Sequence, residues 1–90
     1  MKRVFKYPLE QMDGQKVALP VGAEILSVQV QHETIVLYAL VDDLEQGFEK
    51  RAFRIAGTGH LLEGTDRMKF LGTVQLRAGN LVFHVFEVKE

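Results

Sequence analysis

The residues with the clearest capacity for binding chemistry form one short segment: Gly57, Thr58, Gly59 and His60. Glycines let backbone amides approach a ligand closely, and consecutive amides can form a concave site for an anion. The threonine adds a hydroxyl and the histidine a ring with two nitrogens, while Arg54 adds a guanidinium from the strand expected just before. We therefore expect these five residues to bind a small anionic ligand.

The same segment also fits a purely structural interpretation. A tight turn uses glycines for its backbone geometry alone, and two glycines are a weak signal of binding. The segment is neither a Walker loop nor a dinucleotide fingerprint, because the lysine and the long following helix of those motifs are missing. A binding site and a plain turn both remain open from the sequence.

Catalytic and metal-binding groups are sparse. Nucleophilic catalysis needs Ser, Thr or Cys beside a positioned base, but the chain has no cysteine and Ser27 is its only serine. His84 lies in a predicted strand and is better interpreted as a satisfied, partly buried imidazole. Asp42, Asp43 and Glu45 do not match the spacing of a calcium loop. The sequence thus predicts no metal and no cofactor, and it favours a binding protein over an enzyme.

Alternating hydrophobicity predicts strands rather than helices. Residues 26–31 alternate apolar and polar side chains, which is typical of a strand with one buried face. Thr34–Val41 is apolar on both faces and predicts a central strand. The short link Gln31–Thr34 predicts that these two strands form an antiparallel hairpin.

A second hairpin is predicted near the C-terminus. Phe70–Leu76 and Leu81–Val88 are strand-like and flank Arg77–Asn80. We expect Gly79 and Asn80 to supply the positive φ angles of the turn. The last strand is apolar on both faces, which predicts a second central strand.

Two prolines mark strand ends in the first part of the chain. Residues 4–7 end at Pro8 and residues 15–19 end at Pro20. Proline cannot donate to a β-ladder, so both strands are predicted to be short or at an edge. Asp13-Gly14 is expected to form a turn between them.

These elements predict an all-β fold of one domain, residues 1–90. We expect about seven short, mainly antiparallel strands in a small barrel or sandwich, with at most one short helical turn near residues 61–66. Exposed strand edges further predict a homodimer or a higher homo-oligomer.

Charge and hydropathy limit the partners. Eleven basic and twelve acidic residues give a formal net charge of −1, which disfavours general nucleic-acid binding because phosphate contacts usually need a basic excess. The N-terminus lacks the apolar run of a secretory signal or a membrane span, so a cytoplasmic protein without membrane contact is expected.

Several pieces of the chain resemble a known family. They are 2–7, 26–30, 53–60 and 83–87, and the most specific is the F-R-I-x-G-T-G-H string that ends at His60. Nearly end to end, the chain resembles small uncharacterised proteins encoded by bacteriophages and prophages. Where that family is expected to have tryptophan, this chain has Phe5 and Tyr38, so no role that needs an indole is carried over.

The resemblance implies a phage accessory protein acting in the cytoplasm of the bacterial host. Combined with the Gly57–His60 segment, it leads us to expect a non-catalytic protein that sequesters a small nucleotide-like signalling molecule and so counters host defence. The alternative is a protein–protein inhibitor that blocks a host defence or regulatory protein through a sheet edge or an apolar face. An enzyme acting on nucleotides is the third reading.

Overall fold

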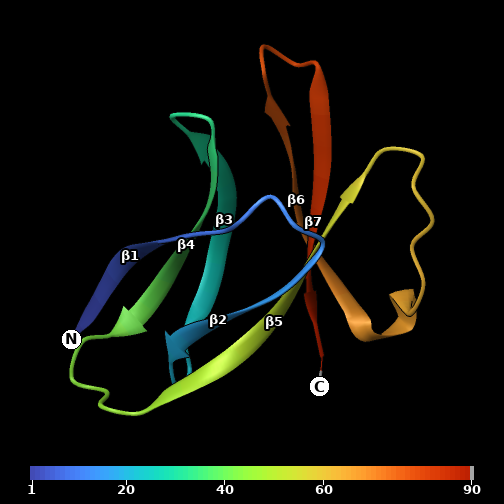
Figure 1. Ribbon diagram of the computed structural model, residues 1–90. Coiled ribbons are helices and arrows are strands. Elements are labelled where there is room, and N and C mark those ends of the chain that lie inside the picture. The colour runs from blue at the N-terminus through green and yellow to red at the C-terminus, as the bar shows by residue number, and fades with distance from the viewer. Residues whose placement is uncertain (90) are drawn as a thin grey trace.

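Two antiparallel β-sheets make up the computed structural model, which describes residues 1–89 (Figure 1). The strands, in chain order, are β1 Lys2–Pro8, β2 Gly14–Pro20, β3 Glu24–Gln31, β4 Thr34–Asp42, β5 Phe48–Gly57, β6 Met68–Leu76 and β7 Leu81–Val88. One sheet has the order β1-β4-β3 and the other β2-β5-β7-β6. The predicted all-β fold with seven antiparallel strands is confirmed, and the sheets pack together without closing a barrel.

The helical content within residues 1–89 is a single 3₁₀ turn, η1, at Thr65–Arg67. The sequence placed a helical turn near residues 61–66, so the observed turn lies at the end of that range. Gly64 precedes it with a φ of 75°, a conformation that glycine adopts without steric cost.

The β3–β4 hairpin forms as predicted, and β4 lies in the centre of its sheet. His32 and Glu33 make the two-residue turn with φ angles of 51° and 60°. Positive φ at both positions is the geometry that matches the twist of a hairpin, although neither residue is glycine or asparagine. Val36 and Leu37 are buried, in agreement with the two-sided apolar pattern of β4.

The β6–β7 hairpin is also confirmed, but its turn differs from the prediction. Positive φ angles occur at Arg77, Ala78 and Gly79, and Asn80 is not among the positive-φ residues. The backbone N–H of Arg77 donates to a carboxylate oxygen of Glu33 at 2.7 Å. This contact joins the tips of two hairpins from different sheets, so tertiary contacts support a turn conformation that its residues alone would disfavour.

Pro8 and Pro20 end β1 and β2, and both strands lie at sheet edges, as the prolines predicted. The expected turn at Asp13-Gly14 does not join two paired strands. Instead β1 pairs with β4 and β2 with β5, so residues 9–13 cross from one sheet to the other and Gly14 already belongs to β2.

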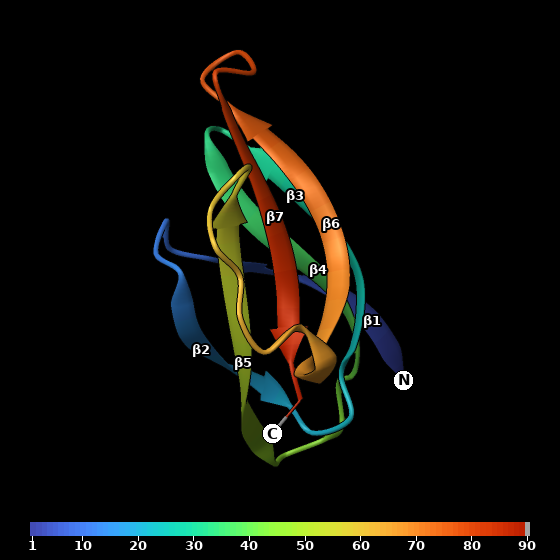
Figure 2. The ribbon, with the colours of Figure 1, turned by 90° about the vertical axis from the view of Figure 1, so that its right-hand side faces the viewer.

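The core lies between the inner faces of the two sheets (Figure 2). The largest fully buried side chains are Phe53, Leu19, Ile35, Leu37, Leu76, Val41 and Val85. On β5 the alternation that buries Phe53 and Ile55 turns Arg54 to the opposite, outer face. Only one face of β5, the strand that leads into the Gly57–His60 segment, therefore packs against the core.

Candidate functional site

The Gly57–His60 segment is a tight turn at the end of β5. The backbone N–H of His60 donates to the carbonyl of Gly57 at 3.1 Å, and Gly59 has a φ of 87°. A positive φ at the third residue is what a type II turn requires, and glycine meets that requirement without strain. Because the His60 amide is used within the turn, it is not available to a ligand.

The imidazole of His60 lies directly over the α-carbon of Gly57. A Cβ atom added to Gly57 would lie 2.9 Å from both Cε1 and Nδ1 of the ring. Real Cβ contacts are not this short, so any side chain at position 57 would displace the ring. Gly57 therefore allows a close approach by His60, while Gly59 supplies the turn geometry.

A hollow of about 350 Å³ opens beside this turn. It is lined by Gly57, Thr58, His60, Asn80, Leu81, Val82 and Phe83. The second wall comes from the start of β7, because the β5–β7 register places Gly57 opposite Phe83. Sequence reasoning missed this wall, since Asn80–Phe83 is at least twenty residues away from the turn and carries no motif of its own.

Thr58 contacts a histidine on the outer face of the same sheet. Its Oγ1 lies 2.8 Å from Nε2 of His84, and Oγ1 of Thr73 lies 2.9 Å from Nδ1. A neutral imidazole donates from one nitrogen and accepts at the other, so one threonine hydroxyl accepts while the other donates. Both ring nitrogens have partners, which agrees with the interpretation of His84 as a satisfied imidazole.

The Thr58–His84 contact has the spacing of a nucleophile beside a base. In such sites a third group usually orients the base and stabilises the imidazolium, and a carboxylate does this best. Here the third group is the neutral hydroxyl of Thr73. The arrangement therefore fixes the orientation of Thr58 and His84, with a hydroxyl in the place where such sites have a carboxylate.

Arg54 is bound by Asp13 rather than directed into the hollow. Its Nε donates to Oδ1 at 2.7 Å and its Nη2 to Oδ2 at 3.0 Å. The hydrogen bond from Arg54 holds the pKa of Asp13 below its ordinary value, and the same bond raises the pKa of Arg54. Arg54 does not line the hollow. The structure thus brings together Gly57, Thr58 and His60 at the hollow, whereas Arg54 is paired with Asp13 outside it.

A second hollow, of about 450 Å³, carries more positive charge and was missed from the sequence. Its lining residues are Glu49, Lys50, Arg51, Ala52, Lys69, Glu87, Val88 and Lys89. Lys50 and Arg51 are neighbours in the sequence, but Lys69 and Lys89 come near them only through the pairing of β5, β6 and β7. Four basic and two acidic residues line this hollow.

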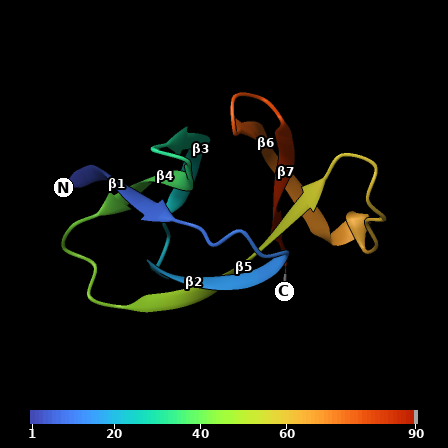
Figure 3. The same ribbon diagram turned by 45° about the horizontal axis from the view of Figure 1, so that its top comes forward.

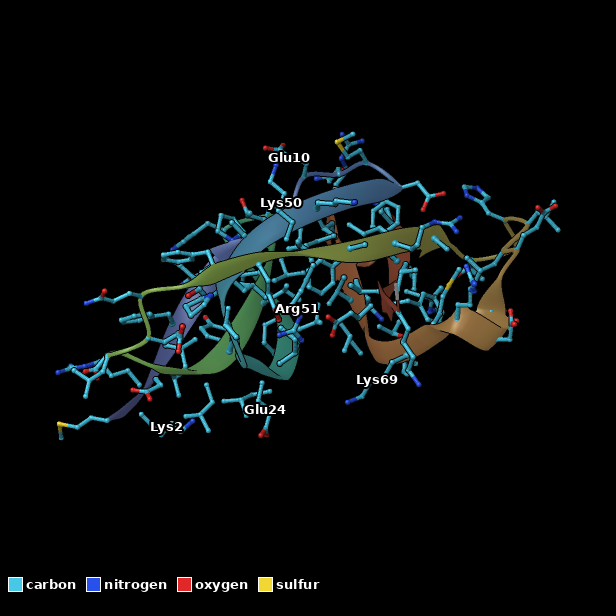
Figure 4. All side chains as sticks on the ribbon, turned by 90° about the horizontal axis from the view of Figure 1, so that it is seen from below. Lys2, Glu10, Glu24, Lys50, Arg51 and Lys69 are labelled. Atoms are coloured by element: carbon cyan, nitrogen blue, oxygen red, sulfur yellow. The ribbon has the colours of Figure 1, made fainter. Side chains whose placement is uncertain are left out.

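Arg51 itself has a structural role in that hollow. Its Nε and Nη2 donate to the Glu87 carboxylate at 2.6 and 2.9 Å, and its Nη1 donates to the carbonyl of Ala23. Figure 4 shows Arg51 between β5 and the three-stranded sheet, while Lys50 lies on the opposite side of β5. The guanidinium therefore ties the two sheets together, and the hydrogen bond to Glu87 raises its pKa.

The acidic residues at the end of β4 form ion pairs with residues at the N-terminus. The amino group of Met1 lies 3.3 Å from carboxylate oxygens of both Asp42 and Asp43, and Arg3 pairs with Asp43. Across residues 1–89, no three His, Cys, Asp or Glu side chains gather as metal ligands would. Within the same residues, no helix is long and apolar enough to cross a membrane.

The fold is all-β, with two packed sheets, and the candidate site is a hollow between the Gly57–His60 turn and the start of β7. The chain belongs to the family described as "Domain of unknown function (DUF7352)", whose model matches residues 1–90. No curated protein and no solved structure matches the chain significantly.

Proposed function

We propose that this chain is a non-catalytic accessory protein of a bacteriophage or prophage. It binds a small nucleotide-like signalling molecule in the cytoplasm of the bacterial host and sequesters it to counter host defence. The observation that carries this proposal is the hollow between the Gly57–His60 turn and the start of β7.

The hollow has the composition of a small-molecule site. Leu81, Val82 and Phe83 supply apolar surface, and His60 and Asn80 supply hydrogen-bonding groups. Ligand sites typically combine a mostly apolar lining with a few polar groups and occupy about 300–1,000 Å³, so this hollow of about 350 Å³ suits a small ligand. An imidazole and a side-chain amide offer both donors and acceptors, as the edge of a nucleobase requires.

Arg54 lies within reach of an extended ligand held in the hollow. It precedes Gly57 by three residues on β5, which corresponds to about 10 Å along a strand. A phosphate would have to compete with the Asp13 carboxylate for this guanidinium. Neutralising Asp13 should therefore strengthen phosphate binding, and removing Arg54 should weaken it.

The experiment starts with native mass spectrometry of protein purified from phage-challenged cells, which identifies any small molecule retained. Calorimetry with that molecule, or with a panel of mononucleotides and cyclic oligonucleotides, then compares variants. Gly59→Val should abolish binding, because a β-branched residue opposes positive φ. Arg54→Ala should weaken it about tenfold or more, as the loss of a charge-assisted bond of about 1.5–3 kcal/mol implies, and His60→Ala should weaken it less. Asp13→Asn should strengthen it.

Two control variants make this test specific. Arg67→Ala removes an exposed arginine that lies beside the end of β7, whereas the hollow is at its start, and should leave binding unchanged. Lys69→Ala tests the more basic hollow at the other end of β5. If Lys69→Ala were the only variant to lose binding, the ligand would be assigned to this more basic hollow instead. Full anti-defence activity of Arg54→Ala and His60→Ala in infected cells would contradict the proposal.

A second candidate is a protein–protein inhibitor, favoured by an aromatic pair on the outer face of the four-stranded sheet. The rings of Phe70 and Phe86 are 5.5 Å apart and tilted by 60°, and Phe70 is more than half exposed. Exposed aromatic side chains often anchor protein interfaces. If Phe70→Asp abolished anti-defence activity while nucleotide binding persisted, this candidate would replace the first.

A further inference from the structure

The imidazole of His84 contacts two threonine hydroxyls at once. Oγ1 of Thr58 lies 2.8 Å from Nε2, and Oγ1 of Thr73 lies 2.9 Å from Nδ1. The three side chains meet because β7 runs between β6 and β5 (Figure 3). The register places His84 opposite Thr73 of β6 on one side and opposite Ala56 of β5, two residues before Thr58, on the other. We call these three side chains the Thr73–His84–Thr58 network.

One end of this network reaches the hollow beside the Gly57–His60 turn. Thr58 is among the residues that line the hollow, whereas His84 and Thr73 are not. The hydroxyl of Thr58 therefore lies between His84 and any ligand in the hollow. A hydroxyl has a single proton, so the direction of its bond to His84 determines whether it can donate to that ligand.

A neutral imidazole allows two arrangements of the network. With the proton on Nδ1, the ring donates to Thr73 and accepts from Thr58, so the Thr58 hydroxyl can only accept from a ligand. With the proton on Nε2, Thr73 donates to the ring and the ring donates to Thr58, whose own proton is then free for an acceptor in the hollow. An imidazolium donates from both nitrogens and leaves Thr58 in this second arrangement.

No carboxylate holds the proton of His84 on one nitrogen. In a catalytic triad, a carboxylate accepts from Nδ1 and so keeps a proton there. Within residues 1–89, the partner of Nδ1 is Thr73, whose hydroxyl can accept or donate. The ionisable groups near this part of the face come from β5 and the connections beside it: Arg54, Asp13, His60 and Glu63. The proton of His84 can therefore take the position that a bound ligand favours.

Thr58 lies where a phosphate would extend from the hollow toward Arg54. The outer face of β5 presents Arg54 and then the small side chain of Ala56, and Thr58 follows at the hollow. Phosphate oxygens are strong hydrogen-bond acceptors. A phosphate at this position therefore favours the arrangement in which Thr58 donates and Nε2 of His84 carries a proton.

We propose that the Thr73–His84–Thr58 network makes the Thr58 hydroxyl a hydrogen-bond donor to a phosphate of the ligand, a role that rests on the proposed binding of a nucleotide-like molecule in the hollow. Thr58 contacts the phosphate directly. Thr73 is a positioning residue, because it lies outside the hollow and acts by donating to Nδ1, which keeps the proton of His84 on Nε2.

Nitrogen-15 NMR of the imidazole rings tests the position of the proton. The full chain, labelled at its histidines, is titrated with AMP, GMP, CMP and UMP, and His84→Gln assigns the signals of this ring. In the complex with the mononucleotide that binds most tightly, Nε2 of His84 should have the chemical shift of a protonated nitrogen. An unprotonated Nε2 in that complex would overturn the proposal.

Calorimetry with the same mononucleotide and its nucleoside tests the two hydroxyls. Thr58→Val and Thr73→Val keep the branched shape, and each should weaken binding of the mononucleotide about 3- to 10-fold, the effect of one hydrogen bond. Binding of the nucleoside should change less than about twofold, because it has no phosphate. Thr58→Ser and Thr73→Ser should bind as the wild type does. Gln75→Ala, the next residue of β6 on the same face, is the matched control and should leave binding unchanged.

The outcomes separate this role from the proposed function. If Arg54→Ala weakens binding while Thr58→Val and Thr73→Val bind as tightly as the wild type, the hollow binds nucleotides and only the role of the network is wrong. If the wild type binds none of the four mononucleotides, both are wrong. Melting of each variant confirms that it is folded, and the serine variants keep the test valid if a valine variant is not.

Discussion

Replacing Arg51 by methionine should destabilise the protein strongly, because this side chain joins the two sheets. Arg51 and Glu87 are only 19% and 17% exposed, and Arg51 makes three hydrogen bonds. A hydrogen bond to a charged group contributes about 1.5–3 kcal/mol, and removing one partner of a fully buried ion pair costs about 3–5 kcal/mol. Since some solvent still reaches this pair, we expect Arg51→Met to lower the free energy of unfolding by about 2–3 kcal/mol.

The Arg54–Asp13 pair provides a matched comparison within the same strand. It is also bidentate, but its side chains are 27% and 57% exposed and it does not connect the two sheets. Exposed pairs contribute about 1 kcal/mol or less, so Arg54→Met should have a small effect. Comparing the loss in free energy of unfolding of the two variants therefore tests whether burial determines how much each ion pair contributes to stability.

Chemical denaturation and thermal melting measure both variants. For a domain of this size, about 2–3 kcal/mol corresponds to a fall in melting temperature of roughly 10–20 °C. The double variant Arg51→Met/Glu87→Leu should recover part of the loss, because it no longer leaves an unpaired carboxylate. Recovery should be incomplete, since the carbonyl of Ala23 still loses its donor. Equal losses for Arg51→Met and Arg54→Met, or a double variant as unstable as Arg51→Met, would refute this reasoning.

Four further predictions concern pH, the turn and the sheet centres. The hydrogen bond from Arg54 lowers the pKa of Asp13 from its ordinary value of 3.8. The pair therefore stabilises the fold above about that pH, and this stabilisation is lost as the pH falls through the lower pKa of the folded state. In urea denaturation across pH 2–7, the free energy of unfolding of Asp13→Asn should fall less steeply at acid pH than that of the wild type. Gly59→Ala should cost about 1–2 kcal/mol, because its φ of 87° disfavours a side chain although nothing lies within 4 Å. Gly57→Ala should instead move the ring of His60 with little loss of stability, which NMR shifts of that ring will report; unchanged shifts would contradict the close contact. The amides of β4 and β7 should exchange most slowly in hydrogen-exchange measurements, and early exchange in both would contradict their central positions.

Local patterns in the sequence were sufficient to predict the strands. Alternation of side chains reports which face of a strand is buried, and proline removes a backbone donor wherever it occurs. These effects act within a few residues, so the seven strands, the ends at Pro8 and Pro20 and the two hairpins could be predicted. The turn at His32-Glu33 could be located by its length, but its positive φ angles could not be predicted from these residue types.

The tertiary structure alone decided which strands share a sheet and which side chains meet at the site. Gly57–His60 was recognisable as a turn because glycine conformation is a local property. The other wall of its hollow and the histidine that contacts Thr58 come from β7, and the threonine that contacts this histidine in turn comes from β6. The carboxylate that binds Arg54 comes from the segment before β2. Strand pairing brings such distant residues together through backbone hydrogen bonds, which are identical for every sequence, and through the packing of a shared core. No local pattern records that pairing, so the sequence indicated where a site begins and the fold determined what completes it.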